Sequence, residues 1–446
     1  MKSLFFPYAN LAAHAILSAA LAFIITTFRI SFLFLYGLHT YIHPDNIAGA
    51  DPAKSNVRAA IRRPDSSHDG PDPGKRRHRS KFDFDESKAQ ILRLRLADAQ
   101  LRSRLYIADY RSAFLYSSLA LANLTLQRFL PADSGILSSV PAALALCAAG
   151  RVAISLVKAA FERSASRKSE KQLSLLVGAV GFLLVLSIFS VLAPTAVDFE
   201  FASAGGLARV SIAILAAGIA ACLYVPSSKV ARSFWLGTDQ LRWSLDVISC
   251  GAPARILLYL NFLMAVFTSL LWVNPVAEML VKKDSDGEAE FRVNDKLEGN
   301  VGLLRSEFLQ FRICCLLGSA VLQILCLRPN LQMFLNEAVL SWYQRLHSSR
   351  VPDLDFGRAK VFLHDYYLCL VSLQFFAVPA LILLFLAFSQ IPGSLFGGFI
   401  YLDIFVHYSS LLKEAALFLA WWVVFIWAAF ISANLALYRY GIFLIS

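Results

Sequence analysis

Six charged residues lie inside apolar stretches of this sequence or at their edges, where ionised side chains are uncommon. They are Arg29, Arg151, Arg312, Asp365, Asp403 and Glu414. A charge at the centre of a bilayer costs about 2.5–3.5 kcal/mol on insertion scales, so such residues raise the hypothesis of a functional site. Arginines facing carboxylates across a water-filled cavity, with His14, His364 and His407 as proton carriers, would suit a transporter or channel.

The same residues also fit structural roles. Arg312 lies close to the start of an apolar run, and Arg29 lies nearer one end of a long run, so both guanidinium groups could reach the interface. Glu414 follows Lys413 where another run starts, which is typical of a boundary. Arg151 is the hardest to explain in this way, although an arginine can also join helices through backbone carbonyls. Both interpretations stay open from the sequence alone.

No motif for enzyme chemistry accompanies these charges. The sequence has no phosphate-binding glycine loop, no Gly-x-Ser-x-Gly elbow and no His-Glu-x-x-His. The adjacent pair His364 and Asp365 would point about 100° apart on a helix and so would not form a dyad. The seven cysteines lie mostly in apolar runs without metal-ligand spacing, which favours free thiols packed as small hydrophobes. We therefore predict a protein that is not an enzyme, with no catalytic, cofactor-binding or metal site.

The elements that hold these residues are predicted to be membrane-spanning helices. The 446 residues are 57% hydrophobic and only 16% charged, against about 45–50% and about 25% in soluble domains. Such a chain has more apolar surface than one compact core can bury. Its net charge of +11 comes with no nucleic-acid-binding signature, which argues against a nucleic-acid partner.

Nine apolar runs are long enough to cross the hydrocarbon core, which needs about 20 residues of helix. They do not alternate as barrel strands would, and backbone groups in lipid need internal partners, so we predict an all-α, polytopic membrane protein. The runs cover approximately residues 11–38, 112–130, 136–160, 173–193, 207–225, 255–275, 306–327, 361–388 and 414–438. Segment 389–413 leaves a further span or half-span open. The first run exceeds a signal-peptide core, so a retained helix is favoured over a cleaved one.

The runs divide the chain into a first helix in 1–43, a polar loop in 44–111 and a multi-helix bundle in 112–446. The connections between runs alternate in charge, with the polar loop rich in Lys and Arg and segment 276–303 acidic. By the positive-inside rule, the basic connections and the C-terminus are cytoplasmic, and the N-terminus is lumenal or extracellular. The charge pattern does not distinguish a plasma membrane from an endomembrane.

The polar loop 44–111 changes character along its length. Its beginning is rich in Pro, Asp and Gly and carries a basic cluster at 75–81, which is typical of disorder. From about Glu86, leucines share one helical face, which predicts a basic amphipathic helix leading into the second span. The arginines that would meet an anionic lipid surface are Arg93, Arg95, Arg102 and Arg104. A solvated helix packed on the bundle is the alternative.

Two further stretches, 229–248 and 330–347, have an apolar stripe opposite a polar one. Neither is apolar enough to span a membrane. We predict that both are helices lying in the interface or under the bundle.

Four strings in the sequence carry a resemblance to a known family. They are Tyr41-Ile42-His43-Pro44; Asn261-Phe262-Leu263 with Leu270-Leu271-Trp272-Val273-Asn274-Pro275; Arg328-Pro329-Asn330-Leu331-Gln332-Met333-Phe334-Leu335-Asn336; and Tyr366-Tyr367-Leu368-Cys369 with Leu373-Gln374. Their order and spacing resemble the transmembrane protein 161 family, best over about 225–390 and thinly over 1–50. The resemblance implies a polytopic membrane protein without established catalytic residues, ligand or cofactor. It also implies a broad link to stress and cell-survival responses and to membrane excitability.

Two classes of function remain after these observations. The absence of catalytic motifs, beside interfacial helices and a basic loop, favours a non-enzymatic membrane protein that regulates or scaffolds others and is linked to stress responses. The intramembrane charges favour a transporter or channel, although no internal repeat is visible. A lipid-modifying enzyme is a third possibility.

Overall fold

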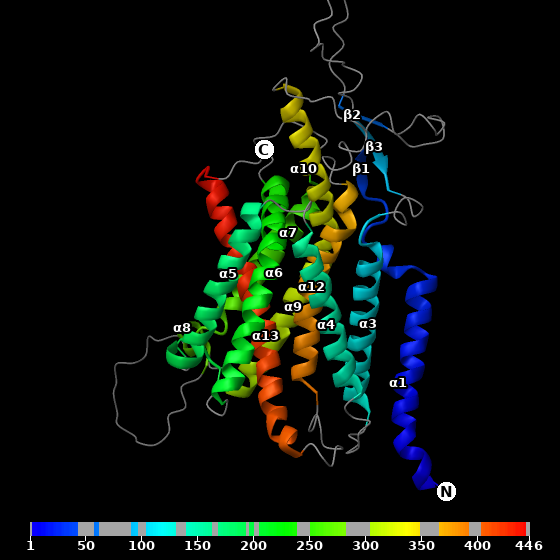
Figure 1. Ribbon diagram of the computed structural model, residues 1–446, viewed down its shortest axis with the longest axis vertical. Helices are drawn as coiled ribbons and strands as arrows, with labels where there is room; N and C mark the ends of the chain where they lie inside the picture. The colour runs from blue at the N-terminus through cyan, green and yellow to red at the C-terminus, as the bar shows by residue number, and fades with distance from the viewer. Residues whose placement is uncertain are drawn as a thin grey trace, which may run out of the picture.

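The computed structural model describes residues 2–42, 58–61, 91–96, 104–130, 140–162, 168–192, 196–199, 205–238, 250–281, 304–347, 365–391 and 403–442. In these residues the protein is a bundle of long, roughly parallel and antiparallel helices, with a small sheet and helix α10 at one end (Figure 1). We call this end the α10 end. The opposite end carries the short helix α8 (Asn274–Leu280), and we call it the α8 end.

The long helices of the bundle correspond to the nine predicted apolar runs. They are α1 (Lys2–Thr27), α3 (Ile107–Phe129), α4 (Val140–Phe161), α5 (Lys168–Ser187, continued by a π-helix at Ile188–Leu192), α6 (Gly206–Thr238), α7 (Ala252–Leu270), α9 (Arg305–Leu325), α12 (Leu368–Ser389) and α13 (Asp403–Arg439). Eight of the described helices are long and apolar enough to cross a membrane. The predicted all-α polytopic architecture is confirmed.

Helix α3 does not reach the apolarity of the other eight. Its 23 residues would extend about 34 Å, enough for the hydrocarbon core, but they include Asp109, Asn123 and Gln127. The helix packs between α1, α4 and α12, which cover much of its polar surface. A helix shielded by neighbours can cross a membrane with more polar side chains than one that faces lipid.

Helix α12 is the centre of the bundle. It is apolar all round, and nearly every residue from Leu368 to Ile382 is buried, as expected for a helix with neighbours on every side. It packs against α3, α4, α9 and α13. Two tryptophans of α13 complete the core: Trp421 Nε1 donates to the carbonyl of Ser269 at 3.1 Å, and Trp422 Nε1 donates to that of Ala216 at 3.0 Å. Both indoles are therefore buried with their N–H groups satisfied.

The first helix is shorter than predicted. The apolar run 11–38 continues past α1, but the helix ends at Thr27, and Arg29 adopts a left-handed conformation (φ 51°) before a short 3-10 helix at Ile30–Phe32. Hydropathy reports burial and not conformation. The apolar residues that follow α1, such as Leu35 and Leu38, are buried in the core without being part of the helix. The expectation that Arg29 lies deep in a span is therefore wrong.

A three-stranded antiparallel sheet replaces part of the predicted amphipathic helix. Its strands are β1 (His39–Ile42), β2 (Arg58–Ile61) and β3 (Ile91–Arg95), in the order β1-β3-β2. The helix predicted from about Glu86 is wrong over 91–95, because alternating Leu and Arg fit a period of two as well as a helical face, and pairing with β1 decides between them. Arg102 lies outside the described residues.

In the described residues, the other two amphipathic stretches belong to long helices that pack on the bundle. Residues 330–347 are helical, within α10 (Leu327–His347), which continues beyond the end of α9 and stands beside the sheet (Figure 1). Helix α10 packs against α6, α12 and β1, which accounts for burial on more than one face. Residues 229–238 are the last turns of α6 and not a separate helix, and 239–249 lie outside the described residues.

Candidate functional site

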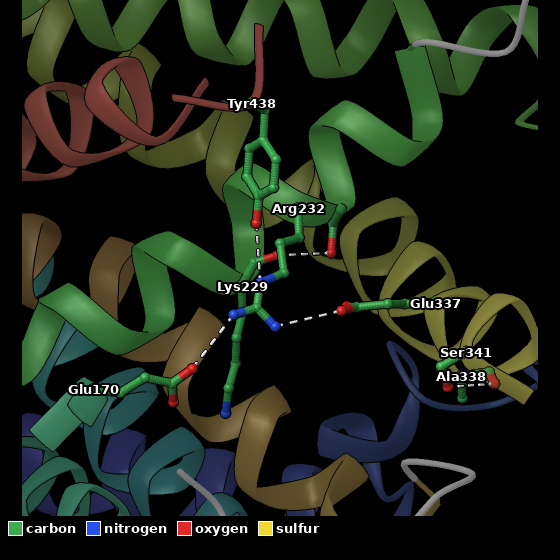
Figure 2. Close-up of polar contacts among 8 residues, drawn as sticks. Glu170, Lys229, Arg232, Glu337, Ala338, Ser341 and Tyr438 are labelled. Atoms are coloured by element: carbon green, nitrogen blue, oxygen red, sulfur yellow. Dashed lines mark hydrogen bonds and ion pairs between the residues drawn. The ribbon is translucent and has the colours of Figure 1, made fainter. Parts of the chain in front are cut away.

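A polar network at the α10 end joins four helices through one guanidinium group. Arg232 of α6 lies 3.3 Å from Glu170 of α5 (Nη2 to Oε1) and 3.4 Å from Glu337 of α10 (Nη1 to Oε1). Its Nε donates to the hydroxyl of Tyr438 of α13 at 3.1 Å. Figure 2 shows the three partners on different sides of the guanidinium group. The planar fork of arginine suits such divided contacts, which a lysine cannot reproduce.

The network extends to the central helix through Lys229. This residue lies one turn before Arg232 on α6, and its Nζ donates to Gln374 Oε1 of α12 at 3.0 Å. The neighbouring carboxylates of Glu170 and Glu337 balance the two cations. The network therefore fixes the relative positions of α5, α6, α10, α12 and α13.

Close packing of α5 on α6 brings Glu170 within reach of Arg232. A Cβ at Gly178 would lie 3.0 Å from Ala221 Cβ, and a Cβ at Gly181 would lie 3.2 Å from Ala220 Cβ. Only glycine permits the two backbones to approach so closely, as small residues do at membrane helix contacts generally. Sequence order alone placed Glu170 and Arg232 in separate connections, so the pair was missed.

A second buried arginine lies towards the α8 end. Arg312 of α9 has a side chain only 3% exposed, and its Nη1 lies 2.6 Å from Asp198 Oδ2. Its Nε donates to the carbonyl of Leu271 at 3.0 Å. The guanidinium carbon lies 4.7 Å from the ring centre of Trp272 and 4.2 Å from that of Phe308. Charge, hydrogen bonds and cation–π contacts thus stabilise Arg312, although its Nη2 is buried without a hydrogen-bond acceptor.

Arg151, predicted as the strongest candidate for a transport pathway, lies in the contact of α4 with α3. Its Nε and Nη2 each lie 3.3 Å from the hydroxyl of Ser112, and Nη2 is 3.7 Å from Asp109 Oδ1. Lys158, two turns further along α4, lies 3.7 Å from the same carboxylate oxygen. The Arg151 side chain is 38% exposed, so it occupies the rim of a helix contact.

Two of the four remaining sequence candidates have side chains that the structure describes, Arg29 and Glu414. Arg29 is exposed beyond the end of α1, and Glu414 is exposed on α13. Asp365 begins a 3-10 helix before α12 and Asp403 begins α13, but their side chains lie outside the described residues. The counter-charges of Arg151 and Arg312 that the structure shows are Asp109 and Asp198, which sequence reasoning did not select.

Of the three histidines predicted as proton carriers, His14 has described contacts. Its Nδ1 lies 2.9 Å from Asn123 Oδ1 and its Nε2 lies 3.1 Å from Gln127 Oε1, so it joins α1 to α3. The amide of Asn123 also donates to Ser18 Oγ at 2.9 Å. The side chains of His364 and His407 lie outside the described residues. All seven cysteines are free, as predicted.

One family model matches the chain. The family described as predicted transmembrane protein 161AB matches residues 185–392. This range contains Lys229, Arg232, Glu337 and Arg312, whereas Glu170 lies before it. No solved structure matches the chain.

Proposed function

We propose that this chain, which belongs to the transmembrane protein 161 family, is a non-enzymatic multi-pass membrane protein that regulates or scaffolds other membrane components. The distribution of its charges supports this proposal. Charges inside the bundle pair with one another: Arg232 joins Glu170 and Glu337 of neighbouring helices, and Arg312 joins Asp198 of the non-helical segment 196–199. Other arginines gather on the sheet and α10, outside the helices long and apolar enough to span.

Paired internal charges favour a structural role over a transport pathway. A pathway needs ionisable groups that face a wet cavity and change partners, whereas these groups join neighbouring helices with short contacts. Buried ion pairs give little net stability, because desolvation offsets the Coulomb energy. Their value lies in specifying which helices meet, since each alternative arrangement would leave a charge unpaired.

We place the α10 end in the cytoplasm. The C-terminal ends of α1, α4, α6 and α13 and the start of α3 all lie at this end (Figure 1), and the basic connections join there. The positive-inside rule then leaves the N-terminus lumenal or extracellular. The protein would reside in the plasma membrane or an endomembrane, and its role in stress responses rests on the family resemblance alone.

The basic loop is the expected contact region for partners. Arg93, Arg95, Arg102 and Arg104 are the residues proposed to contact anionic lipid. Of these, Arg93 and Arg95 lie on strand β3 and not on the predicted helix. Deleting residues 75–88 removes the basic cluster at 75–81 and leaves β3 in place. Its matched control is a deletion of the same length, 286–299, in the acidic connection.

Affinity purification from native membranes tests the proposal. We expect the 75–88 deletion to lose partners that the 286–299 deletion retains, with both proteins inserted and folded. Identical partner sets in the two deletions and the parent would count against the basic loop as the interaction region.

Reconstitution distinguishes the alternative, a transporter or channel. We expect purified protein in liposomes to show no ion or proton flux of its own. A flux that disappears in a folded Arg151→Leu variant would overturn the proposed function and favour the alternative.

A further inference from the structure

Three hydrogen bonds hold the sheet against α10. The backbone N–H of His39 donates to Gln332 Oε1 at 2.9 Å, and Gln332 Nε2 donates to the carbonyl of His39 at 3.2 Å. The hydroxyl of Tyr41 donates to Asn336 Oδ1 at 2.9 Å. Tyr41 is fully buried, and this burial raises its pKa to about 12. The position of β1 on α10 is therefore fixed.

The register of the sheet brings arginines to the face that meets α10. His39 pairs with Arg95, and Tyr41 pairs with Arg93. Residues directly opposite one another in an antiparallel pair point to the same face, so Arg93 and Arg95 share the face of Tyr41. The register also places Arg58 of β2 opposite Arg93.

A third arginine approaches from α10. A Cβ built on Gly37 would lie 3.3 Å from Nε and Nη2 of Arg95 and 3.4 Å from Nη2 of Arg328. The guanidinium groups of Arg95 and Arg328 thus converge on one point above the backbone of Gly37. Glycine keeps that point open, and its φ of +75° is one that other residues adopt only with strain.

These cations have no carboxylate partner among the described residues. The ion pairs between described residues do not include Arg93, Arg95 or Arg328. Nε of Arg93 is buried without a hydrogen-bond acceptor. Burial, together with the charges of Arg93 and Arg95, lowers the pKa of His39, which agrees with a region of positive potential. Like charges held together in this way are unfavourable unless an anion joins them.

The cluster lies just beyond the membrane-spanning helices. Arg328 lies three residues after Leu325, the last residue of α9, which corresponds to about 4.5 Å of helical rise. Figure 1 shows β1 and β3 beside α10 at this end of the bundle. An anion bound here would sit at the level of lipid headgroups, where phosphates are abundant.

We infer that Arg93, Arg95 and Arg328 form a binding site for a phosphate monoester, such as the headgroup phosphate of a phosphorylated inositol lipid. Guanidinium groups bind such dianions through paired, charge-assisted hydrogen bonds. The inference deepens the proposed function and rests on it for the cytoplasmic placement of the site. The depth of the site favours a lipid as the source of the phosphate over a soluble compound.

Lipid retention by the full-length protein tests this site. The protein is incorporated into phosphatidylcholine nanodiscs with a trace of phosphatidylinositol bisphosphate, and the bound lipid is quantified after purification. We expect Arg95→Gln and Arg328→Gln each to weaken binding about tenfold, equivalent to about 1.4 kcal/mol. The matched control Arg439→Gln removes an exposed cation at the same end and should leave binding unchanged.

Each outcome of this experiment decides a point. Competition by inositol hexakisphosphate at equal affinity would support the site but assign it to a soluble phosphate. Equal retention of phosphatidylserine, or an equal loss in Arg439→Gln, would overturn the site in favour of general electrostatic attraction. If Arg95→Gln fails to fold, Arg95→Lys retains the charge without the fork and serves in its place. Lipid binding is measured on purified protein without partners. Absence of lipid binding would therefore contradict the site at Arg95 and Arg328 without affecting the comparison of partners between the 75–88 and 286–299 deletions.

Discussion

The arginines at the two ends of the molecule differ in whether a carboxylate pairs with them. Towards the α8 end, Arg312 has a carboxylate, a backbone carbonyl and two aromatic rings around one guanidinium group. At the α10 end, Arg95 and Arg328 converge above Gly37, and Arg93 shares the strand face of Arg95, without a carboxylate partner among the described residues. The charge of Arg312 is balanced by Asp198, although its Nη2 has no acceptor, whereas the charges at the α10 end become favourable when an anion binds.

This difference in pairing distinguishes arginines that stabilise the packing from arginines that are available to bind a ligand. A buried charge that is balanced by a carboxylate specifies how the chain packs around it and does not need a ligand for neutralisation. Exposed or half-buried cations that repel one another store unfavourable electrostatic energy that binding releases. The network at Arg232 lies between these limits, because it is paired with Glu170 and Glu337 but remains 35% exposed.

The largest expected effect is at Arg312. Replacing it with leucine leaves the carbonyl of Leu271 without this donor and leaves Asp198 with Arg305 alone. Because Asp198 is partly exposed, we expect a cost near the lower end of the range of about 3–5 kcal/mol for breaking a buried pair. We expect a large drop in the melting temperature in detergent. Arg305→Leu is the matched control, because Arg305 faces the same carboxylate at 3.7 Å with a side chain 74% exposed, and exposed pairs contribute about 0–1 kcal/mol. Equal decreases in melting temperature in the two variants would contradict the assignment of Arg312 as the buried partner of Asp198.

A smaller loss is expected at Arg232. Arg232→Leu removes contacts to three helices but at a partly exposed position, so we expect about 2–3 kcal/mol. Glu337→Gln should cost more than Glu170→Gln, because the Glu337 side chain is 12% exposed and that of Glu170 is 28% exposed. The melting temperatures of the three variants give the order, and a reversed order would show that Glu170 is the principal partner.

Gly37 links stability to binding at the α10 end. We expect Gly37→Ala to cost about 1–2 kcal/mol because of its positive φ, and to weaken retention of the inositol lipid because the new methyl group meets Arg95. Gly150→Ala in α4 has open space around its Cβ and should be neutral or stabilising by about 0.5–1 kcal/mol. Normal lipid retention in Gly37→Ala would contradict the proposed convergence above Gly37.

The smallest effect concerns His39 and pH. Burial lowers the pKa of His39 below 6.5, and the charges of Arg93, Arg95 and Arg328 add to this effect against an opposing hydrogen bond with Gln332. The folded state therefore favours the neutral imidazole. As pH falls below about 6.5, the unfolded chain binds more protons and docking of the sheet loses stability. Hydrogen exchange of β1, corrected for intrinsic rates, should therefore quicken at pH 5.5 relative to pH 7.5. A His39→Gln variant that retains the same pH dependence would assign it to another group.

The positions of the membrane helices were largely predictable from the sequence. Lipid and a packed core both select long apolar runs, so hydropathy located the nine long bundle helices of the described residues within several residues of most of their ends. Hydropathy went wrong after Thr27, where the left-handed backbone at Arg29 ends the helix although apolar residues follow. The amphipathic pattern went wrong at 91–95, where pairing with β1 gives a strand.

The sequence by itself determined that the chain is a polytopic helical membrane protein, because every long apolar run must satisfy its backbone internally in lipid. It also marked Arg151 and Arg312 as unusual. Only the tertiary structure decided what these charges do, because Asp198 is 114 residues from Arg312 in the chain, and Glu337 is 105 residues from Arg232. Contacts at such separations follow from how helices pack and from the register of a sheet, which local patterns of residues do not encode.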